Sequence, residues 1–161
     1  MKDFLAFTLI AIFSIFLGSQ ITEGVLLVPY WQSLSPTAFY EYYDTFGSVI
    51  SRYYSFLTII AVLIPFSLSI YCYYKRSDGL RYSFVSSFFA ILIITIFYIY
   101  FKETNQLFHA RAFDTDQLKT VLNTWEFWHW SRVFFEIHSL IFLILTFNIL
   151  KQNSKKVNAA N

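Results

Sequence analysis

The sequence predicts an all-α membrane protein, a four-helix transmembrane bundle with an antiparallel, up-down-up-down topology. Hydrophobic residues make up 57% of the 161-residue chain and charged residues only 14%, whereas soluble domains carry about 25% charged residues. The remaining charges are sparse in four long apolar stretches, at residues 4–22, 53–74, 82–101 and 133–150. About 20 apolar residues cross the hydrocarbon core of a bilayer, so each stretch is expected to form one transmembrane helix.

An aromatic segment separates the first two predicted spans. The first helix is expected to continue to near Pro29, and Pro29 and Pro36 bracket a turn. Residues 37–50 then mix aromatic and acidic side chains, which is typical of an amphipathic helix at the outer membrane surface. The second span follows at about residues 51–74, and Pro65 inside it is expected to kink the helix.

Short connections lead into and out of the third predicted helix. The connection at residues 75–81 is brief, so the second and third helices are expected to be neighbours. The third helix is expected at about residues 80–109 and is followed by a loop at residues 110–115. Asp114 or Thr115 is the expected N-cap of the fourth helix, because short oxygen-bearing side chains accept hydrogen bonds from the first free backbone N–H groups.

The fourth helix is expected to run from Asp116 to about Lys151. It completes a single membrane domain, residues 1–151, since 161 residues are the length of one domain. Residues 152–161 are polar and are expected to form a frayed cytoplasmic tail.

Positive charges gather on one side of the predicted bundle. The side that holds both termini and residues 75–81 carries seven cationic residues: Lys2, Lys75, Arg76, Arg81, Lys151, Lys155 and Lys156. Only Asp3 and Asp78 oppose them there. Cationic loops stay cytoplasmic, so we expect a multi-pass protein of the inner or plasma membrane with its N- and C-termini cytoplasmic. The net charge of +2 is too small to indicate nucleic-acid binding, and the expected partner is the lipid bilayer.

A polar stripe opens the last helix. Three of the four tryptophans fall within residues 125–130. Trp125, His129, Arg132 and Glu136 follow one another at intervals of four, three and four residues, which places them on one helical face. Ionisable residues inside a membrane span are costly and therefore indicate a functional site or a specific partner.

Polar residues at the outer ends of the other helices are expected to meet this stripe. Gln20 and Glu23 lie near the end of the first helix, and Asn105 and His109 near the end of the third. Counting about 1.5 Å of rise per residue places Glu23, Asn105 and His129 at similar heights. The sequence thus predicts one outward-facing polar pocket between the helices.

One interpretation of this pocket is a metal site. His109, His129 and Glu23 would be the ligands, with Glu136 as a further ligand or a hydrogen-bond acceptor behind them. Two imidazoles with carboxylates suit iron, copper or zinc. A haem held between His109 and His129 is a related alternative, and it would be non-covalent because the chain has no Cys-x-x-Cys-His attachment motif. The remaining alternative is that the protein binds no cofactor.

A second interpretation is acid–base catalysis on a lipophilic small molecule. His129 would transfer a proton near neutral pH, and Arg132 would stabilise an enolate or phenolate oxygen. Glu136 is the third expected catalytic residue. Aromatic side chains would stack on an aromatic substrate; the expected substrate-binding residues are Trp125, Trp128, Asn105 and Tyr53.

A purely structural interpretation stays open as well. Arg132 would then pair with Glu136 on its own helix or with Glu23 across helices, because polar contacts between helices hold membrane bundles together. The protein would in that case be a structural or accessory membrane subunit. His138 lies two residues from Glu136, so it faces away from the stripe and is expected to pack elsewhere.

Several of these features occur together in a known order. Gly24 and Pro29 form a Gly-x-x-x-x-Pro stretch, aromatic residues follow at 39–46, and Asn105 ends the third helix. A Trp-x-x-Trp-Asn/His-x-x-Arg motif opens the fourth, with the matching residues Trp125, Trp128, His129 and Arg132. Over residues 18–147 the chain resembles a family of small four-helix membrane proteins that includes the fungal anthrone oxygenases. The resemblance implies an oxidoreductase or oxygenase acting on a lipophilic aromatic compound. The chain departs from the family pattern by having His129 where Asn is common, and His109 as a second imidazole.

Overall fold

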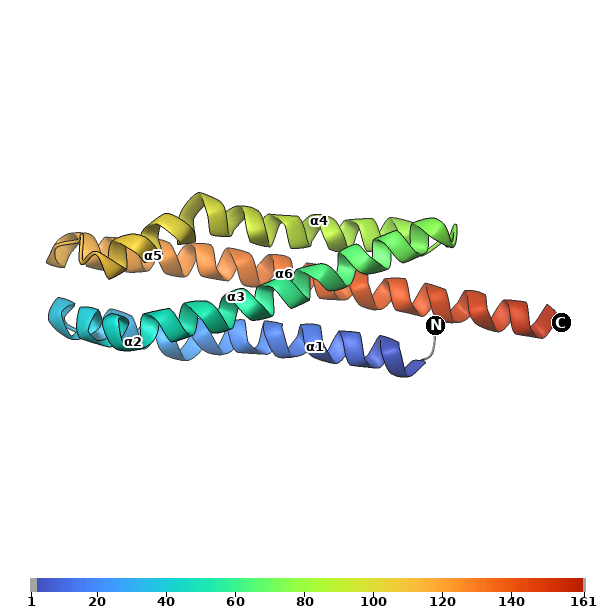
Figure 1. Ribbon diagram of the computed structural model, residues 1–161, viewed down its shortest axis with the longest axis horizontal. Helices are drawn as coiled ribbons and strands as arrows, with labels where there is room; N and C mark the ends of the chain where they lie inside the picture. Colours follow the sequence, from blue (N-terminus) through green and yellow to red (C-terminus); the bar gives the residue numbers. More distant parts are fainter. Residues whose placement is uncertain (1–2, 161) are drawn as a thin grey trace.

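The computed structural model describes residues 3–160, with side chains through Asn153, and this part of the chain contains helices and no strand (Figure 1). Two of the segments are π-helices, labelled η1 and η2. The elements in chain order are α1 (Asp3–Thr22), η1 (Glu23–Leu27), α2 (Val28–Ser33), α3 (Pro36–Tyr74), α4 (Leu80–Ile96), η2 (Phe97–Phe101), α5 (Lys102–His109) and α6 (Thr115–Ala160).

These elements form four continuous apolar helices. By length and composition each could cross a membrane: Asp3–Ser33, Pro36–Tyr74, Leu80–His109 and Thr115–Asn153. They correspond to the four apolar stretches of the sequence, so the prediction of four long apolar helices is confirmed. The chain therefore has the composition and the helix lengths of a membrane protein.

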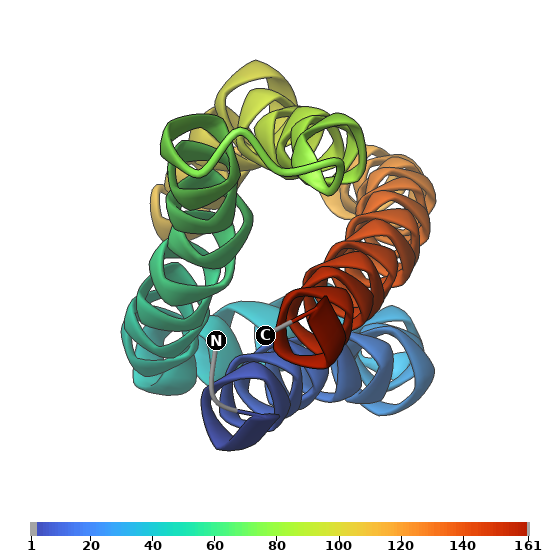
Figure 2. The ribbon, with the colours of Figure 1, turned by 90° about the vertical axis from the view of Figure 1, so that its right-hand side faces the viewer.

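The four helices lie side by side along the long axis of the molecule (Figure 2). The most extensive contact is between α4 and α6, where Ser86 and Ser139 each donate a hydroxyl hydrogen bond to the backbone carbonyl of the other, at 2.8 and 3.0 Å. Ser69 of α3 and Ser87 of α4 share a hydroxyl hydrogen bond of 2.9 Å. Small residues at these positions allow the helix backbones to approach closely.

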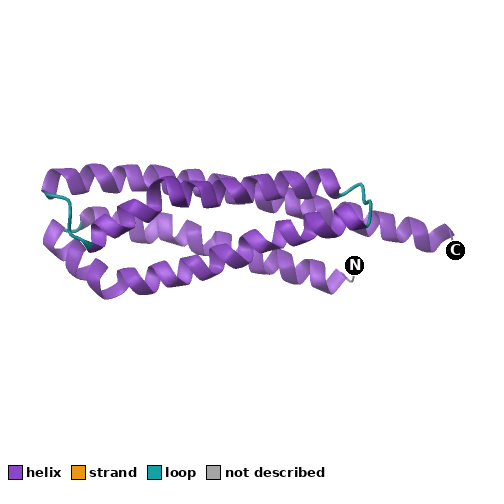
Figure 3. Cartoon of the chain, turned by 45° about the horizontal axis from the view of Figure 1, so that its top comes forward, coloured by secondary structure: helices purple, strands orange, loops and turns teal. Residues whose placement is uncertain are grey.

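Three short connections join the helices at the two ends of the molecule (Figure 3). At one end, the Lys151 ammonium lies 3.0 Å from the Asp3 carboxylate, and Asn153 donates a 3.5 Å hydrogen bond to Asp78. These contacts bring the start of α1, the later part of α6 and the α3–α4 connection together. At the other end, Arg111 lies 2.5 Å from the Asp44 carboxylate and ties the α5–α6 connection to α3.

Two of the expected boundaries are wrong. Residues 37–50 are not a separate outer segment but the first part of α3, because Pro36 stands in its first turn and the single Gly47 does not interrupt the helix. The last helix does not end near Lys151 but continues through Ala160. The expected cap is confirmed, since the Asp114 carboxylate accepts hydrogen bonds from the backbone N–H groups of Asp116 and Gln117, at 3.1 and 2.9 Å.

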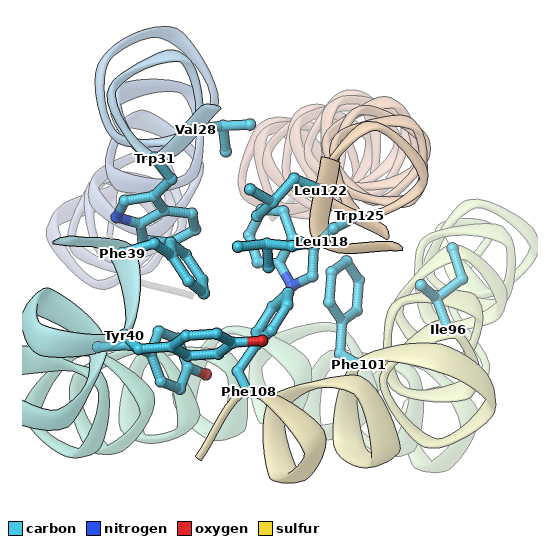
Figure 4. Close-up of a cluster of buried hydrophobic side chains, with 11 residues drawn as sticks. Val28, Trp31, Phe39, Tyr40, Ile96, Phe101, Phe108, Leu118, Leu122 and Trp125 are labelled. Atoms are coloured by element: carbon cyan, nitrogen blue, oxygen red, sulfur yellow. The ribbon is translucent and has the colours of Figure 1, made fainter. Parts of the chain in front are cut away.

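Two buried apolar clusters fill the molecule. One is mainly aromatic and packs residues of α2, α3, α4, η2, α5 and α6 together (Figure 4). We call it the aromatic cap, and its buried members are Val28, Trp31, Phe39, Tyr40, Tyr43, Ile96, Phe101, Phe108, Leu118, Leu122 and Trp125. The other is built from α1, α3 and α6 and includes Phe13, Leu68 and Leu143. Between these two clusters lies a group of buried polar side chains.

Candidate functional site

Arg132 is the centre of the buried polar group. Its Nη2 atom donates hydrogen bonds to Gln20 Oε1, to Glu23 Oε2 at 3.3 Å and to His129 Nδ1 at 3.0 Å. Its Nε atom lies 3.8 Å from the Glu136 carboxylate. All five residues are at most 7% exposed, so the guanidinium joins α1 and η1 to α6 inside the molecule.

The stripe predicted on the last helix is present. Trp125, His129, Arg132 and Glu136 are all buried on the same side of α6. Arg132 contacts both Glu23 and Glu136, as the structural interpretation of the sequence predicted. His138 is outside the group, because its Nδ1 atom contacts the Phe134 carbonyl at 2.8 Å and its ring packs against Phe134.

His129 has neither ring nitrogen free. Nε2 lies 2.9 Å from the backbone carbonyl oxygen of Gln20, which can only accept a hydrogen bond, so Nε2 carries the proton. Nδ1 then accepts the hydrogen bond from Arg132. The imidazole also stacks on the Trp125 indole, with ring centroids 5.2 Å apart and an interplanar angle of 11°. Packed and hydrogen-bonded on all sides, His129 holds Arg132 in place.

The π-helix η1 brings Glu23 and Gly24 to the site. Pro29, five residues after Gly24, has no backbone N–H and its ring would clash with the carbonyl group four residues earlier. The helix widens instead, and the Val28 N–H bonds to the Glu23 carbonyl five residues back. Both Glu23 and Gly24 are then buried. A Cβ atom on Gly24 would lie 2.9 Å from His129 Nε2, so this close approach to α6 requires glycine.

The second π-helix, η2, places an aromatic ring against Arg132. The Lys102 N–H bonds to the Phe97 carbonyl, again five residues back. Phe101, the last residue of η2, is buried, and the Arg132 guanidinium lies 4.7 Å from the centre of its ring. This cation–π contact stabilises a desolvated positive charge by about 2 kcal/mol. Both π-helices therefore supply a neighbour of Arg132.

Several buried polar atoms of this group have no hydrogen-bond partner among the described residues. They are Gln20 Nε2, Arg132 Nε and both carboxyl oxygens of Glu136. Leaving such atoms unpaired is costly. The group also contains one guanidinium for two carboxyl groups, so its charge is balanced when it holds one additional proton. The site is therefore suited to accept hydrogen-bonding atoms and a proton.

A cavity of about 460 Å³ reaches this group from the side of α3. Its wall is mostly apolar and aromatic, with Tyr43, Tyr54, Phe97, Phe101 and Trp125 among the lining residues. Glu23 and Arg132 are the charged residues that line it. The volume falls in the range of about 300–1,000 Å³ for small-molecule sites, which are typically apolar with a few polar groups.

Polar groups of the cavity wall add to its chemistry. Trp125 Nε1 donates a 3.2 Å hydrogen bond to Asn105 Oδ1, and both residues line the cavity. Trp31 also lines it, and its buried indole N–H has no acceptor within the described part of the chain. A bound molecule with oxygen acceptors would satisfy groups that the protein leaves unpaired.

Some residues expected at the site lie elsewhere. Tyr53 is 50% exposed and does not line the cavity, whereas its neighbour Tyr54 does. Trp128 stacks on Tyr100, 6.0 Å away between ring centres, and is also outside the cavity wall. Glu136 and His129 stand behind Arg132 and do not line the cavity. Of the four expected substrate-binding residues, the structure brings Trp125 and Asn105 to the cavity.

The expected metal ligands do not assemble. His129 and Glu23 are close, with Nδ1 and Oε2 3.6 Å apart. His109 is exposed and packs against Tyr43 at the level of the aromatic cap, with ring centres 4.7 Å apart and an interplanar angle of 58°. Residues 3–160 contain no group of three or more His, Cys, Asp and Glu side chains placed to hold a metal ion. The combination of His109, His129 and Glu23 is therefore not formed.

Gln20, which was expected to meet the stripe, lies at the centre of the polar group and contacts Arg132 and His129. Sequence reasoning missed two residues of the site. Tyr54 and Phe101 were not singled out. Gly47, Tyr54 and Thr58 recur at helical spacing and all line the cavity, so the periodicity of the second helix carried a signal for Tyr54. Nothing in the sequence indicated Phe101, because its position depends on η2.

Comparison with known proteins identified no relative of this chain. No protein-family model, no curated protein and no solved structure matches this chain.

Proposed function

We propose that the protein is a multi-pass protein of the inner or plasma membrane whose four helices run antiparallel with both termini in the cytoplasm. Four helices of sufficient length and apolar character support this topology. The Asp3–Lys151 and Asp78–Asn153 contacts support it further, because they group the two terminal helix ends with the α3–α4 connection. The excess of Lys and Arg in these segments favours the cytoplasmic side.

We further propose that the protein is an enzyme that oxidises a lipophilic aromatic compound carrying an enolisable ketone or a phenol. The observation that carries this proposal is the composition of the cavity: a wall rich in aromatic rings, with Glu23 and Arg132 together as its charged residues. The resemblance to the family that includes anthrone oxygenases agrees with this substrate class. Aromatic walls bind aromatic rings, and a carboxylate beside a guanidinium suits proton removal with stabilisation of the resulting oxyanion.

The chemical roles follow from the contacts. Glu23, which lines the cavity, takes a proton from a CH₂ group that the ketone acidifies, either directly beside it or, as in anthrone, conjugated with it through the aromatic rings. Arg132 stabilises the enolate oxygen, and His129 positions Arg132 rather than acting as the base, because both of its nitrogens are engaged. Glu136 balances the charge of Arg132 from behind. The electron-rich enolate then reacts with dioxygen: a CH₂ group and O₂ become a C=O group and H₂O, a four-electron oxidation of carbon matched by a four-electron reduction of dioxygen.

Oxygen uptake by the purified protein in lipid nanodiscs, with anthrone as the probe, tests this function. The wild type should consume dioxygen and form anthraquinone faster than protein-free nanodiscs do. Glu23→Gln should lower the protein-dependent rate by about 10²-fold or more, the usual contribution of a general base. Glu103→Gln, an exposed carboxylate on α5, is the matched control and should keep the wild-type rate.

A structural role for the polar group is the main competing function, favoured by the bridges that Arg132 makes between helices. This structural role predicts a different result for the same experiment. If the wild type shows no anthrone oxidation above protein-free nanodiscs, while Glu23→Gln and Arg132→Lys only lower the unfolding temperature, the enzyme proposal is wrong and the structural role holds.

A further inference from the structure

One side of the cavity is formed by residues that also face outward. Ile59 and Leu63 of α3 line the cavity and are 61% and 57% exposed. Tyr98 of η2 lines it as well and is 63% exposed. Exposed apolar residues in the middle of a membrane-spanning helix face the acyl chains of the lipid. The rim formed by these residues is therefore at the protein–lipid boundary.

This rim is closed off at both of its ends by contacts of α3. Toward the α3–α4 connection, Ser69 and Ser87 hold the two helices together. Toward the other end, Tyr43 packs against Phe108 and His109, with ring centres 5.3 and 4.7 Å apart. Between these contacts α3 runs obliquely and separates from the chain leading into η2 (Figure 1). Since the cavity wall between these contacts includes the exposed residues Ile59, Leu63 and Tyr98, the cavity opens there through a window in the side of the bundle.

The aromatic cap closes the cavity toward the end of the molecule that holds the α5–α6 connection. Trp31, Tyr43, Phe101 and Trp125 belong both to the cap and to the cavity wall, and each is at most 5% exposed. Beyond them the cap continues with further buried apolar residues, including Leu118 (Figure 4). A molecule therefore reaches Glu23 and Arg132 more readily through the side window than through this end.

We infer that the cavity takes its ligand laterally from the hydrocarbon core of the bilayer, and that this ligand is an amphiphile with an aromatic head and a hydrocarbon tail. The oxygen of the head group lies at Glu23 and Arg132. The tail passes between Leu63 and Tyr98 and stays among the lipid acyl chains. The choice of an oxygen-bearing aromatic head rests on the function proposed above, whereas the window rests on the exposed rim and its two closed ends alone.

Photo-cross-linking in nanodiscs tests the window. The probe is 4-dodecyloxybenzophenone, whose ketone is both the expected Arg132 ligand and the photoreactive group. In the wild type, labelling should map to peptides of the cavity wall that contain Tyr54, Phe101 or Trp125. Leu63→Trp and Ile59→Trp narrow the window and should each lower this labelling about tenfold, a difference of about 1.4 kcal/mol in binding.

The matched control is Ile70→Trp, a residue of α3 with the same 57% exposure as Leu63 that does not line the cavity. Its labelling should equal that of the wild type. If both window variants label as strongly as Ile70→Trp, or if labelling maps to lipid-facing residues outside the cavity, the lateral window is wrong. Glu23→Gln separates the two proposals. Unchanged cavity labelling with lost anthrone oxidation supports both, and unchanged oxidation overturns the proposed chemistry but leaves the window standing.

Discussion

Arg132 carries the only positive charge in a buried group that contains two carboxyl side chains, Glu23 and Glu136. Replacing it with alanine removes hydrogen bonds to three side chains and leaves both carboxyl groups without a cationic partner. Breaking a buried ion pair in this way costs about 3–5 kcal/mol. We expect Arg132→Ala to lower the free energy of unfolding in detergent by that amount, measured by denaturant titration.

Arg52→Ala is the control for this prediction, because Arg52 is exposed on α3 and its loss should change the free energy of unfolding by no more than about 0.5 kcal/mol. A triple variant with Arg132→Met, Glu23→Gln and Glu136→Gln should recover part of the stability lost in Arg132→Ala, since it removes the unpaired charges as well. Equal stability of Arg132→Ala and the wild type would show that the group is not desolvated.

Two glycines of the first apolar helix provide a second test at the scale of single residues. At Gly24 an added Cβ would lie 2.9 Å from both His129 and Trp130, whereas at Gly18 it would meet nothing within 4 Å. Gly24→Ala should therefore destabilise the protein by about 1–3 kcal/mol through overpacking. Gly18→Ala should stabilise it by about 0.5–1 kcal/mol, because alanine loses less backbone entropy in a helix. Unfolding temperatures that shift in the same direction for both variants would contradict the close contact at Gly24.

At the scale of helices, the pattern of buried residues shows what could be predicted from the sequence and what could not. The interval of four, three and four residues from Trp125 to Glu136 correctly placed these residues on one face, because α6 is a regular helix there. In the third apolar helix, however, the buried series steps from Ile96 to Phe101, an interval of five residues. A search for intervals of three and four residues misses this step, which is why Phe101 was not predicted.

The backbone conformation just after α3 and α5 leads to a prediction about stability. Two residues beyond the end of each helix lies an arginine in the left-handed conformation, Arg76 with φ of 49° and Arg111 with φ of 52°. At the first, the N–H of Ser77 bonds back to the Cys72 carbonyl at 3.0 Å, the pattern of a helix end that normally contains glycine. Arg76→Gly should stabilise the protein by about 1 kcal/mol because the left-handed conformation strains residues with a Cβ.

Arg81→Gly is the opposite control, since Arg81 lies in the first turns of α4 and glycine within a helix costs about 1 kcal/mol. Thermal unfolding of the two variants should therefore move in opposite directions. A lower unfolding temperature for Arg76→Gly would mean that contacts of the arginine side chain stabilise the protein by more free energy than its left-handed backbone conformation costs.

At the scale of the whole molecule, composition alone was sufficient to predict four long apolar helices, and the polar stripe was sufficient to locate the site along them. The sequence also predicted a polar pocket that faces outward. The structure has a mostly apolar cavity with Glu23 and Arg132 in its wall. The aromatic cap, which includes Phe39, Phe108 and Leu118, closes it toward the end that holds the α5–α6 connection. Tyr53 and Tyr54 are indistinguishable by residue type. The helical spacing of Gly47, Tyr54 and Thr58 groups Tyr54 with them, but only the orientation of α3 shows that this face lines the cavity.

The proposed topology can be measured by labelling single cysteines in intact cells. In a Cys72→Ser background, Ala112→Cys lies in the α5–α6 connection and Lys75→Cys in the α3–α4 connection, and both positions are exposed. A membrane-impermeant maleimide should label Ala112→Cys in intact cells and Lys75→Cys only after permeabilisation. The reverse pattern would place both termini outside, and labelling of both positions in intact cells would contradict the spanning of the membrane.

The π-helical segment η2 has a genetic consequence. A π-helical turn holds one residue more than the α-helical turn it replaces, and each residue of an α-helix turns the chain by about 100°. In-frame loss of one codon within residues 97–100 would restore a regular helix, because no proline lies in or after this segment of the helix, and would rotate Phe101 away from Arg132 or Ile96 away from the aromatic cap. The length of the protein, its loops and the apolar character of its helices would be almost unchanged. A lineage could thus gain or lose this site by a single insertion or deletion rather than by accumulated substitutions.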